Sequence, residues 1–278
     1  MPTGLRVVTF TSGGEVYHHN IEAEGGEVAM ESETTNLLLY NNDTEYIVFE
    51  HPDSFSDCTA TTRRRNGGFY SGNARVGSDT VSEPVRSQPD ILYRRGMSQT
   101  KVDSILQKEE SDPATVHIVP TTLYPAVYIY VVHFNFDRGL EYVLNGAAAV
   151  TGMSAGVNLS TGNTLEETCT MMFDCRKTDN GMTGTFVSFG VPGYTPENGE
   201  LYQPHGRYGI TLQLVLTNSK RVSYTMDITP QMSAQPCGGV IMTGGITVEE
   251  EDAKPEGGGS FDVSVDPWGA PNDYEISL

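Results

Sequence analysis

The chain has 278 residues, an ordinary apolar fraction of 37% and a formal net charge of −19 at pH 7. This length is comfortable for two domains and long for one small sandwich. The negative charge disfavours nucleic acid and anionic lipid as partners, because their phosphates would be repelled. The sequence contains no run of 18 apolar residues, so it predicts no transmembrane helix.

Short alternating runs separated by turn residues predict strands in the first part of the chain. They lie at Leu5–Thr11, Glu27–Met30, Asn36–Tyr40 and Tyr46–Glu50. Residues 51–98 hold several Gly, Pro and Arg residues and predict long connections with one or two short strands.

One helix is predicted before the middle of the chain, at Ser98–Glu109. Val102, Ile105 and Leu106 follow the i, i+3, i+4 spacing of a helical apolar face, and Ser98 is a suitable N-cap. Ser111-Asp112-Pro113 then interrupts the pattern. We therefore expect an N-terminal domain of residues 1–113 and a C-terminal domain of residues 114–278.

The second part of the chain predicts longer strands. A β run begins at Val116 and continues through Ala126–Phe136, which is dense in β-branched and aromatic residues. Arg138–Asn145 predicts one helical turn, and Phe186–Gly190 and Gly239–Val248 predict further strands.

The clearest signal is the hairpin predicted at Thr211–Ile228. Apolar residues alternate with polar ones on both arms of the turn Asn218-Ser219-Lys220, so each arm has one face to bury. The core-facing residues are expected to be Leu212, Leu214, Leu216, Val222, Tyr224 and Met226. The whole pattern is typical of an all-β protein built from two tandem antiparallel β-sandwiches.

The C-terminal tail carries a further amphipathic pattern. Phe261, Val263 and Val265 alternate with polar residues after the flexible run Gly257–Gly259, and Trp268 follows. An unpaired strand of this kind invites aggregation. We therefore expect it to pair within its own second domain in the isolated chain, and to be available for re-pairing with a neighbour in an assembly.

Gly152-Met153-Ser154-Ala155-Gly156 matches the nucleophile motif G-x-S-x-G, which requires a strand before the serine and a helix after it. The residues that follow do not predict a helix, and His205 is the only histidine downstream. We interpret the glycines as permitting a strand bulge or a close backbone approach, and no catalytic residue is predicted.

The four cysteines are Cys58, Cys169, Cys175 and Cys237, and no spacing among them suggests a metal site. On one strand Cys169 and Cys175 would lie roughly 20 Å apart on the same face, too far for a disulfide. Most of the cysteines are therefore expected to be buried free thiols.

Other chemically interesting residues have ordinary structural explanations. The scattered histidines, including His133 in the aromatic strand, are expected to be partly buried and uninvolved in metal binding. The acidic run Glu249–Asp252 would point its carboxylates to opposite faces of a strand, so no metal or cofactor is predicted.

Two sequence features each have two interpretations. Tyr124, Tyr128 and Tyr130 are candidates for a sugar-binding platform, although core packing explains them better. Arg63-Arg64-Arg65 is a candidate protease site, or simply a charged loop.

Three blocks of the sequence together resemble the fimbrillin-like minor fimbrial subunits of Bacteroides and Porphyromonas, a family of anchor and tip lipoproteins. The first block is Asn36–Phe49 with Gly25-Gly26-Glu27-Val28 before it. The second is Ala147–Gly156, followed by Leu159-Ser160-Thr161-Gly162 and Gly184–Gly190, and the third is Gly257–Leu278.

This resemblance implies two β-sandwiches of transthyretin-like topology and a structural or adhesive role at the outer membrane, as a component or anchor of a fimbria. It implies partners that are other fimbrial subunits, joined by strand exchange, with a host or bacterial surface ligand as a further partner, and it implies no catalysis. Family members are anchored through a lipidated N-terminal cysteine; this sequence lacks that cysteine, so membrane attachment would require a precursor. A surface glycan-binding lipoprotein is the alternative.

Overall fold

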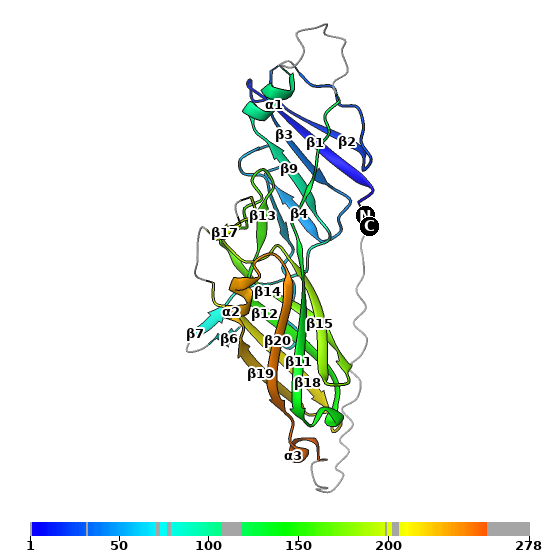
Figure 1. The fold of residues 1–278 in the computed structure, drawn as a ribbon, viewed down its shortest axis with the longest axis vertical. Coiled ribbons are helices and arrows are strands. Elements are labelled where there is room, and N and C mark those ends of the chain that lie inside the picture. The colour runs from blue at the N-terminus through cyan, green and yellow to red at the C-terminus, as the bar shows by residue number, and fades with distance from the viewer. Residues whose placement is uncertain are drawn as a thin grey trace, which may run out of the picture.

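The computed structural model describes residues 2–31, 33–70, 73–76, 79–106, 118–197, 199–201 and 206–254. These residues form an elongated molecule made mostly of β-strands, with one group of sheets toward each end (Figure 1). The all-β class predicted from the sequence is confirmed.

The N-terminal residues build a five-stranded antiparallel sheet. Its order is β10-β9-β3-β1-β2. The bounds are Gly4–Thr11 for β1, Val16–Glu22 for β2, Thr34–Asn41 for β3, Tyr93–Met97 for β9 and Tyr124–Pro125 for β10.

A smaller antiparallel sheet shares a core with this one. It has the order β13-β5-β4, with β4 at Ile47–Glu50, β5 at Thr59–Thr62 and β13 at Gly156–Asn158. Val8 and Leu38 of the larger sheet and Ala60 of the smaller one belong to the same buried cluster. Burying alternate residues of both sheets against each other is the packing of a β-sandwich.

The second group centres on an eight-stranded sheet, in which β20 runs parallel to β11, β8 runs parallel to β14, and the other pairs are antiparallel. The order is β19-β18-β12-β14-β15-β11-β20, with β8 beside β14. The bounds are Val85–Arg86 for β8, Tyr128–Arg138 for β11, Val143–Ser154 for β12, Thr168–Thr178 for β14, Gly181–Ser188 for β15, Gly209–Leu216 for β18, Arg221–Asp227 for β19 and Gly239–Thr247 for β20.

This sheet curves until its two ends approach each other. The Tyr224 hydroxyl of β19 donates a hydrogen bond of 2.7 Å to the Thr247 carbonyl oxygen of β20, although these strands lie at opposite ends of the strand order. One buried cluster accordingly contains residues from both ends of the sheet, such as Leu214 and Ile241.

The remaining elements are short. Two-stranded pairs form from β6 (Asn73–Val76) with β7 (Asp79–Ser82), and from β16 (Tyr194–Thr195) with β17 (Glu200–Leu201). The helices are α1 (Gln99–Leu106), α2 (Thr229–Ala234), α3 (Glu250–Ala253) and the 3-10 turn η1 (Leu140–Tyr142). In Figure 1, α1 lies at one end of the molecule and α3 at the other.

Residues from the second part of the chain also enter the N-terminal cluster. Ala126, Val157 and Phe189 are buried there beside Leu38. The two groups of sheets are therefore joined by more than one chain segment. The expected domain boundary at residue 113 lies outside the described residues.

The predicted hairpin is confirmed. Strands β18 and β19 pair antiparallel, with Leu212 opposite Tyr224 and Leu214 opposite Val222. The three leucines are fully buried, and the apolar residues of β19 pack half-buried on the same core.

Other predicted elements are present in the structure with somewhat different bounds. The predicted helix forms as α1 with Val102 fully buried; Glu109 lies outside the described residues. The helical turn predicted within Arg138–Asn145 appears as η1, and the strands predicted at Ala126–Phe136 and Gly239–Val248 appear as β11 and β20.

The strand predicted at Glu27–Met30 is wrong. The chain turns at Gly25, whose φ is +128°, and β1 is already paired by β2 and β3 on its two sides. Those residues therefore have no free β1 edge to join. The strand β2 was not predicted, because its sequence VYHHNIE places polar residues on an exposed edge strand.

Two further expectations are corrected. Residues 51–98 contain more than one or two strands, since β5, β6, β7, β8 and β9 all lie there. The strand predicted at Phe186–Gly190 begins earlier, at Gly181, because glycines hide its first half. Strands of five residues or fewer leave little local alternation for a sequence pattern to detect.

Replacing Leu214 with alanine tests the second core. The side chain is fully buried, so Leu214→Ala should lower the free energy of unfolding by about 2–5 kcal/mol through lost burial and a residual cavity. Urea denaturation followed by circular dichroism measures the change.

The matched control for that experiment is Ser223→Ala, an exposed position on the outer face of β19, which should change the free energy of unfolding by less than about 0.5 kcal/mol. Equal losses for both variants would contradict the assignment of Leu214 to the core.

Candidate functional site

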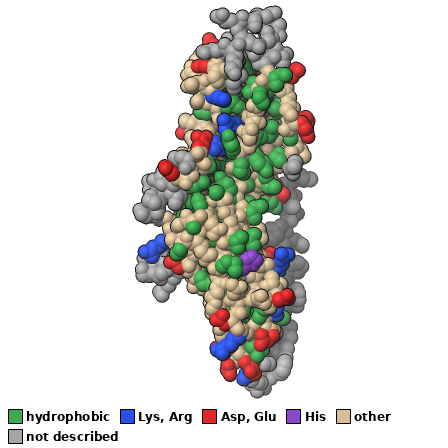
Figure 2. Space-filling model, in the orientation of Figure 1, with side chains coloured by type: hydrophobic (Ala, Val, Ile, Leu, Met, Phe, Trp, Pro, Cys, Tyr) green, Lys and Arg blue, Asp and Glu red, His purple; other side chains and the backbone are tan. Residues whose placement is uncertain are grey.

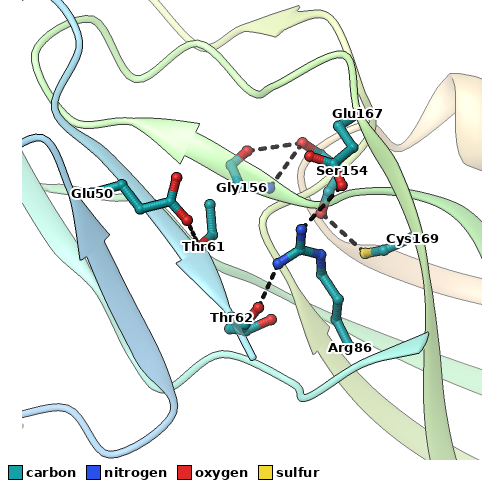
Figure 3. Close-up of polar contacts among 8 residues, drawn as sticks. All are labelled: Glu50, Thr61, Thr62, Arg86, Ser154, Gly156, Glu167 and Cys169. Carbon is teal, nitrogen blue, oxygen red and sulfur yellow. Dashed lines mark hydrogen bonds and ion pairs between the residues drawn. The ribbon is translucent and has the colours of Figure 1, made fainter. Parts of the chain in front are cut away.

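The G-x-S-x-G segment lies where β12 runs into β13, so a strand rather than a helix follows Ser154. The serine is fully buried, and its hydroxyl donates toward the carbonyl oxygens of Gly156 and Leu165, each 2.8 Å away (Figure 3). A serine nucleophile needs an adjacent base. Within the described part of the chain, no hydrogen bond to Ser154 comes from a histidine; His205 lies outside it.

The two glycines of the motif allow a backbone bulge and close contacts between backbone segments, as the sequence indicated. Gly152 has a φ of +84° and lies at a register shift between Val150 and Met153. A Cβ at Gly152 would lie 2.5 Å from the Arg207 carbonyl oxygen, and one at Gly156 would lie 2.5 Å from that of Ala60. The bulge and the close approach are confirmed.

Near Ser154, a polar cluster lies where the two groups of sheets meet, and Arg86 links them (Figure 3). Arg86 of β8 donates to the Thr62 carbonyl oxygen of β5 at 2.5 Å and forms an ion pair with Glu167 at 3.0 Å. Thr61 donates to Glu50 at 2.8 Å. Because most of the Arg86 side chain is buried, we interpret this cluster as a structural junction.

Glu83 is a half-buried acid beside this junction. One of its carboxylate oxygens accepts hydrogen bonds from the Gly152 amide and the Thr170 hydroxyl, both at 2.8 Å. Its other carboxylate oxygen is buried with no hydrogen-bond partner among the described residues. Burial raises the pKa of Glu83, partly offset by those hydrogen bonds.

The cysteines are free thiols, as expected, and three of them are buried. Burial raises the pKa of Cys58 to about 11 and of Cys175 to about 12, and raises that of Cys169 as well. Such thiols remain protonated and unreactive. Cys237 is exposed, and its sulfur lies 3.8 Å from the Tyr194 hydroxyl.

Within the acidic run Glu249–Asp252, Glu249 is the N-cap of α3 and the next three residues lie in that helix, so the run does not form a strand. Glu249 pairs with Arg138, and Asp252 pairs with Lys220 at 2.6 Å. Figure 2 shows acidic and basic side chains intermingled at the end of the molecule where α3 lies. Among the residues that the structure describes, no group of three or more His, Cys, Asp or Glu could hold a metal ion.

The three tyrosines that were candidates for a sugar platform differ in their exposure to solvent. Tyr130 is fully buried and stacks on Phe186 with ring centroids 4.9 Å apart, which confirms the core interpretation for it. Tyr128 is half-buried, and Tyr124 is 42% exposed with the Arg95 guanidinium 4.8 Å from its ring centroid.

Tyr124 and Tyr128 instead line a pocket that the sequence did not predict. Its volume is about 570 Å³, and we call it the arginine–tyrosine pocket. It is lined by Arg94, Arg95, Tyr124, Pro125, Tyr128, Tyr194, Pro196, Glu197 and Cys237. The only sequence signal for it is the pair of arginines inside a strand of a very acidic chain.

The Arg63-Arg64-Arg65 segment exposes its side chains, but its backbone is held. The Arg65 amide donates to the Val85 carbonyl oxygen, and the Arg63 carbonyl oxygen accepts from the Ser87 amide, both at 2.9 Å. His133 is half-buried, as expected. The strand predicted at Phe261–Val265 and Trp268 lie outside the described residues.

Across the residues that the structure describes, no helix has the length and apolar character needed to span a membrane.

Comparison with known proteins gives a family and relatives. The family model described as "Domain of unknown function (DUF5119)" matches residues 1–174. A relative from Bacteroides ovatus named "Putative fimbrium anchoring subunit Fim4B" is 23% identical, over 100% of this chain and 86% of the relative. The resemblance expected from the sequence is confirmed by this full-length similarity.

Two solved structures are similar to this chain to different degrees. A "putative adhesin" from Bacteroides ovatus has a TM-score of 0.63 and 21% identity, covering 90% of this chain and 85% of that one. The fimbrial anchor protein Mfa2 from Porphyromonas gingivalis has a TM-score of 0.48 and 9% identity, covering 91% of this chain and 86% of that one. The first shows that the fold is shared.

Replacing Ser154 with alanine tests the structural role of the motif. Ser154→Ala would remove the hydroxyl donor from the Leu165 carbonyl oxygen and leave the Gly156 carbonyl oxygen with the Leu165 amide, and it should lower the free energy of unfolding by about 1–3 kcal/mol. Urea denaturation measures this, and Ser104→Ala, an exposed serine on α1, is the control. Labelling of native Ser154 by a fluorophosphonate probe would contradict this interpretation.

Replacing Glu83 with glutamine tests the effect of desolvating its carboxylate. Because its folded-state pKa is raised above the ordinary value of 4.5, ionised Glu83 destabilises the fold at neutral pH, and this penalty disappears as pH falls through the folded pKa. Glu83→Gln, which resembles the neutral acid, should therefore be more stable than the wild type at pH 7.

This difference in stability should shrink as pH falls toward 4.5 and below. Thermal unfolding at a series of pH values measures it, with Glu45→Gln at an exposed position as the control for the loss of one charge. A stability difference that is constant with pH would exclude Glu83 as its source.

Proposed function

This chain belongs to the DUF5119 family, and on that premise we propose that it is a structural and adhesive component, or the anchor, of a cell-surface fimbria. The observation that carries the proposal is the similarity to the fimbrium anchoring subunit over the whole of this chain. Its buried serine and buried, protonated cysteines are consistent with a role that requires no catalysis.

The proposal includes two β-sandwich domains of transthyretin-like topology, divided near residue 113. The support is the existence of two large buried clusters, one between the five-stranded and three-stranded sheets and one within the eight-stranded sheet. Segments such as Val157 would then cross from the second domain into the first core.

Assembly with other subunits by strand complementation is also part of the proposal. In the described part of the chain, β2 pairs only with β1, so its outer backbone edge is available to another strand. Exposed edges of this kind are the sites at which strand addition occurs. The proposed location is the bacterial outer membrane, with attachment through a lipid on a precursor.

Deleting the gene and examining the fimbriae tests the role. We expect the chain to co-purify with sheared fimbriae, and its loss to reduce cell-bound fimbriae or release them into the medium. Immunoblots of cell, sheared and medium fractions measure both, with wild-type complementation as the control. Unchanged fimbriae, together with absence of the chain from the sheared fraction, would refute the proposal.

A chain ending at residue 259 tests the C-terminal segment. If residues 260–278 pair within their own domain, truncation should lower the melting temperature of the purified protein, as removal of a packed strand exposes apolar core surface. If the melting temperature is unchanged and only incorporation into fimbriae is lost, pairing of this segment within its own domain is wrong. Donation of the strand to a neighbouring subunit is then supported.

A further inference from the structure

The arginine–tyrosine pocket lies where β9 and β10 meet the start of β11 and β16, and its lining brings two cations together with three tyrosines. We propose that this pocket binds a carboxylated sugar ring, such as the uronic or sialic acid unit of a glycan. The proposal does not depend on the fimbrial role.

Arg94 provides the first argument. Arg94 is only 2% exposed, yet among the described residues no carboxylate contacts it directly. One guanidinium nitrogen donates to the Ser160 carbonyl oxygen at 3.1 Å, and Nε is buried without a partner among the described residues. Burying a charge with no counterion in direct contact is costly. A bound anion would supply the missing partner.

The space for this guanidinium is made by a glycine. Gly162 has a φ of +78°, and a Cβ there would overlap the Arg94 guanidinium. The neighbouring loop is fixed by Asn158, whose side-chain oxygen accepts from the Ser160 and Thr161 amides, both at 3.0 Å. The buried cation is therefore held in a defined position.

Arg95 adds a second cation. Its guanidinium lies over the Tyr124 ring at 4.8 Å, so a cation–π contact limits its motion. Guanidinium groups form paired, charge-assisted hydrogen bonds with carboxylates. Glu197 lies near enough to Arg94 to influence its pKa electrostatically, and its carboxylate would repel a phosphate dianion more than a carboxylate monoanion.

The tyrosines indicate what carries the carboxylate. Tyr124 is exposed and Tyr128 is half-buried, so their rings can contact the C–H groups of a sugar and their hydroxyls its polar edge, whereas Tyr194 is a buried residue of the lining. Glu197 adds an acceptor for sugar hydroxyls. The volume of about 570 Å³ lies in the range of small-molecule sites. A hydroxylated ring with one carboxylate uses all of these features.

Isothermal titration with glucuronic acid and N-acetylneuraminic acid tests the proposal, with glucose as the neutral control. At least one acid should bind saturably, and glucose should bind about tenfold or more weakly, since charge-assisted hydrogen bonds are worth more than neutral ones. Arg95→Gln should weaken binding of that acid about tenfold or more, and Arg176→Gln, at an exposed arginine elsewhere, should leave it unchanged.

Arg94→Gln should also weaken binding of that acid about tenfold or more, and Tyr124→Ala provides a second variant if Arg94→Gln does not fold. The proposal is overturned if neither acid binds, if glucose binds equally well, or if Arg95→Gln and Tyr124→Ala both bind normally. It is also overturned if the dipeptide Gly-Tyr binds through its free carboxylate while both sugar acids fail. Normal fimbriation by Arg95→Gln would leave the fimbrial proposal intact, so the two can fail separately.

Discussion

The passage of one continuous segment from one sheet into another governs the architecture. Residues 143–158 run along β12 in the eight-stranded sheet and, after a bulge at Gly152, continue as β13 in the three-stranded sheet. Gly156 lets β13 approach Ala60 closely, and the Ser154 hydroxyl donates to the carbonyl oxygens of Gly156 and Leu165 next to the bend. Buried carbonyl groups need such donors.

The polar junction is a consequence of this crossing. Once β13 pairs with β5, the ends of β5 and β8 come together, and Arg86 can reach the Thr62 carbonyl oxygen. Glu83 lies next to the bulge, where its carboxylate accepts a hydrogen bond from the Gly152 amide. A buried charge is tolerated there because it accepts hydrogen bonds, at the energetic cost of its desolvation.

The arginine–tyrosine pocket depends on the same crossing. The chain leaving β13 makes the turn at Asn158 that places Ser160 against β9, where its carbonyl oxygen holds Arg94. The start of β11 and the strand β16 then supply Tyr128 and Tyr194. A protein with a formal net charge of −19 thereby concentrates two of its few cations in one recess, where they act on a small anion at short range rather than through the overall field.

The sequence by itself determined the all-β class, the hairpin of β18 and β19, the helix α1 and the burial of most cysteines, because each depends on alternation or composition within a few consecutive residues. Tertiary structure alone decided the pairing of β5 with β13 and of β8 with β14, and the contact of Arg94 with Ser160, 66 positions away. It also separated Tyr130 from Tyr124, since one ring entered the core while the other stayed at the surface. Local patterns record which face a strand buries, whereas the choice of distant partners follows from packing all the faces together.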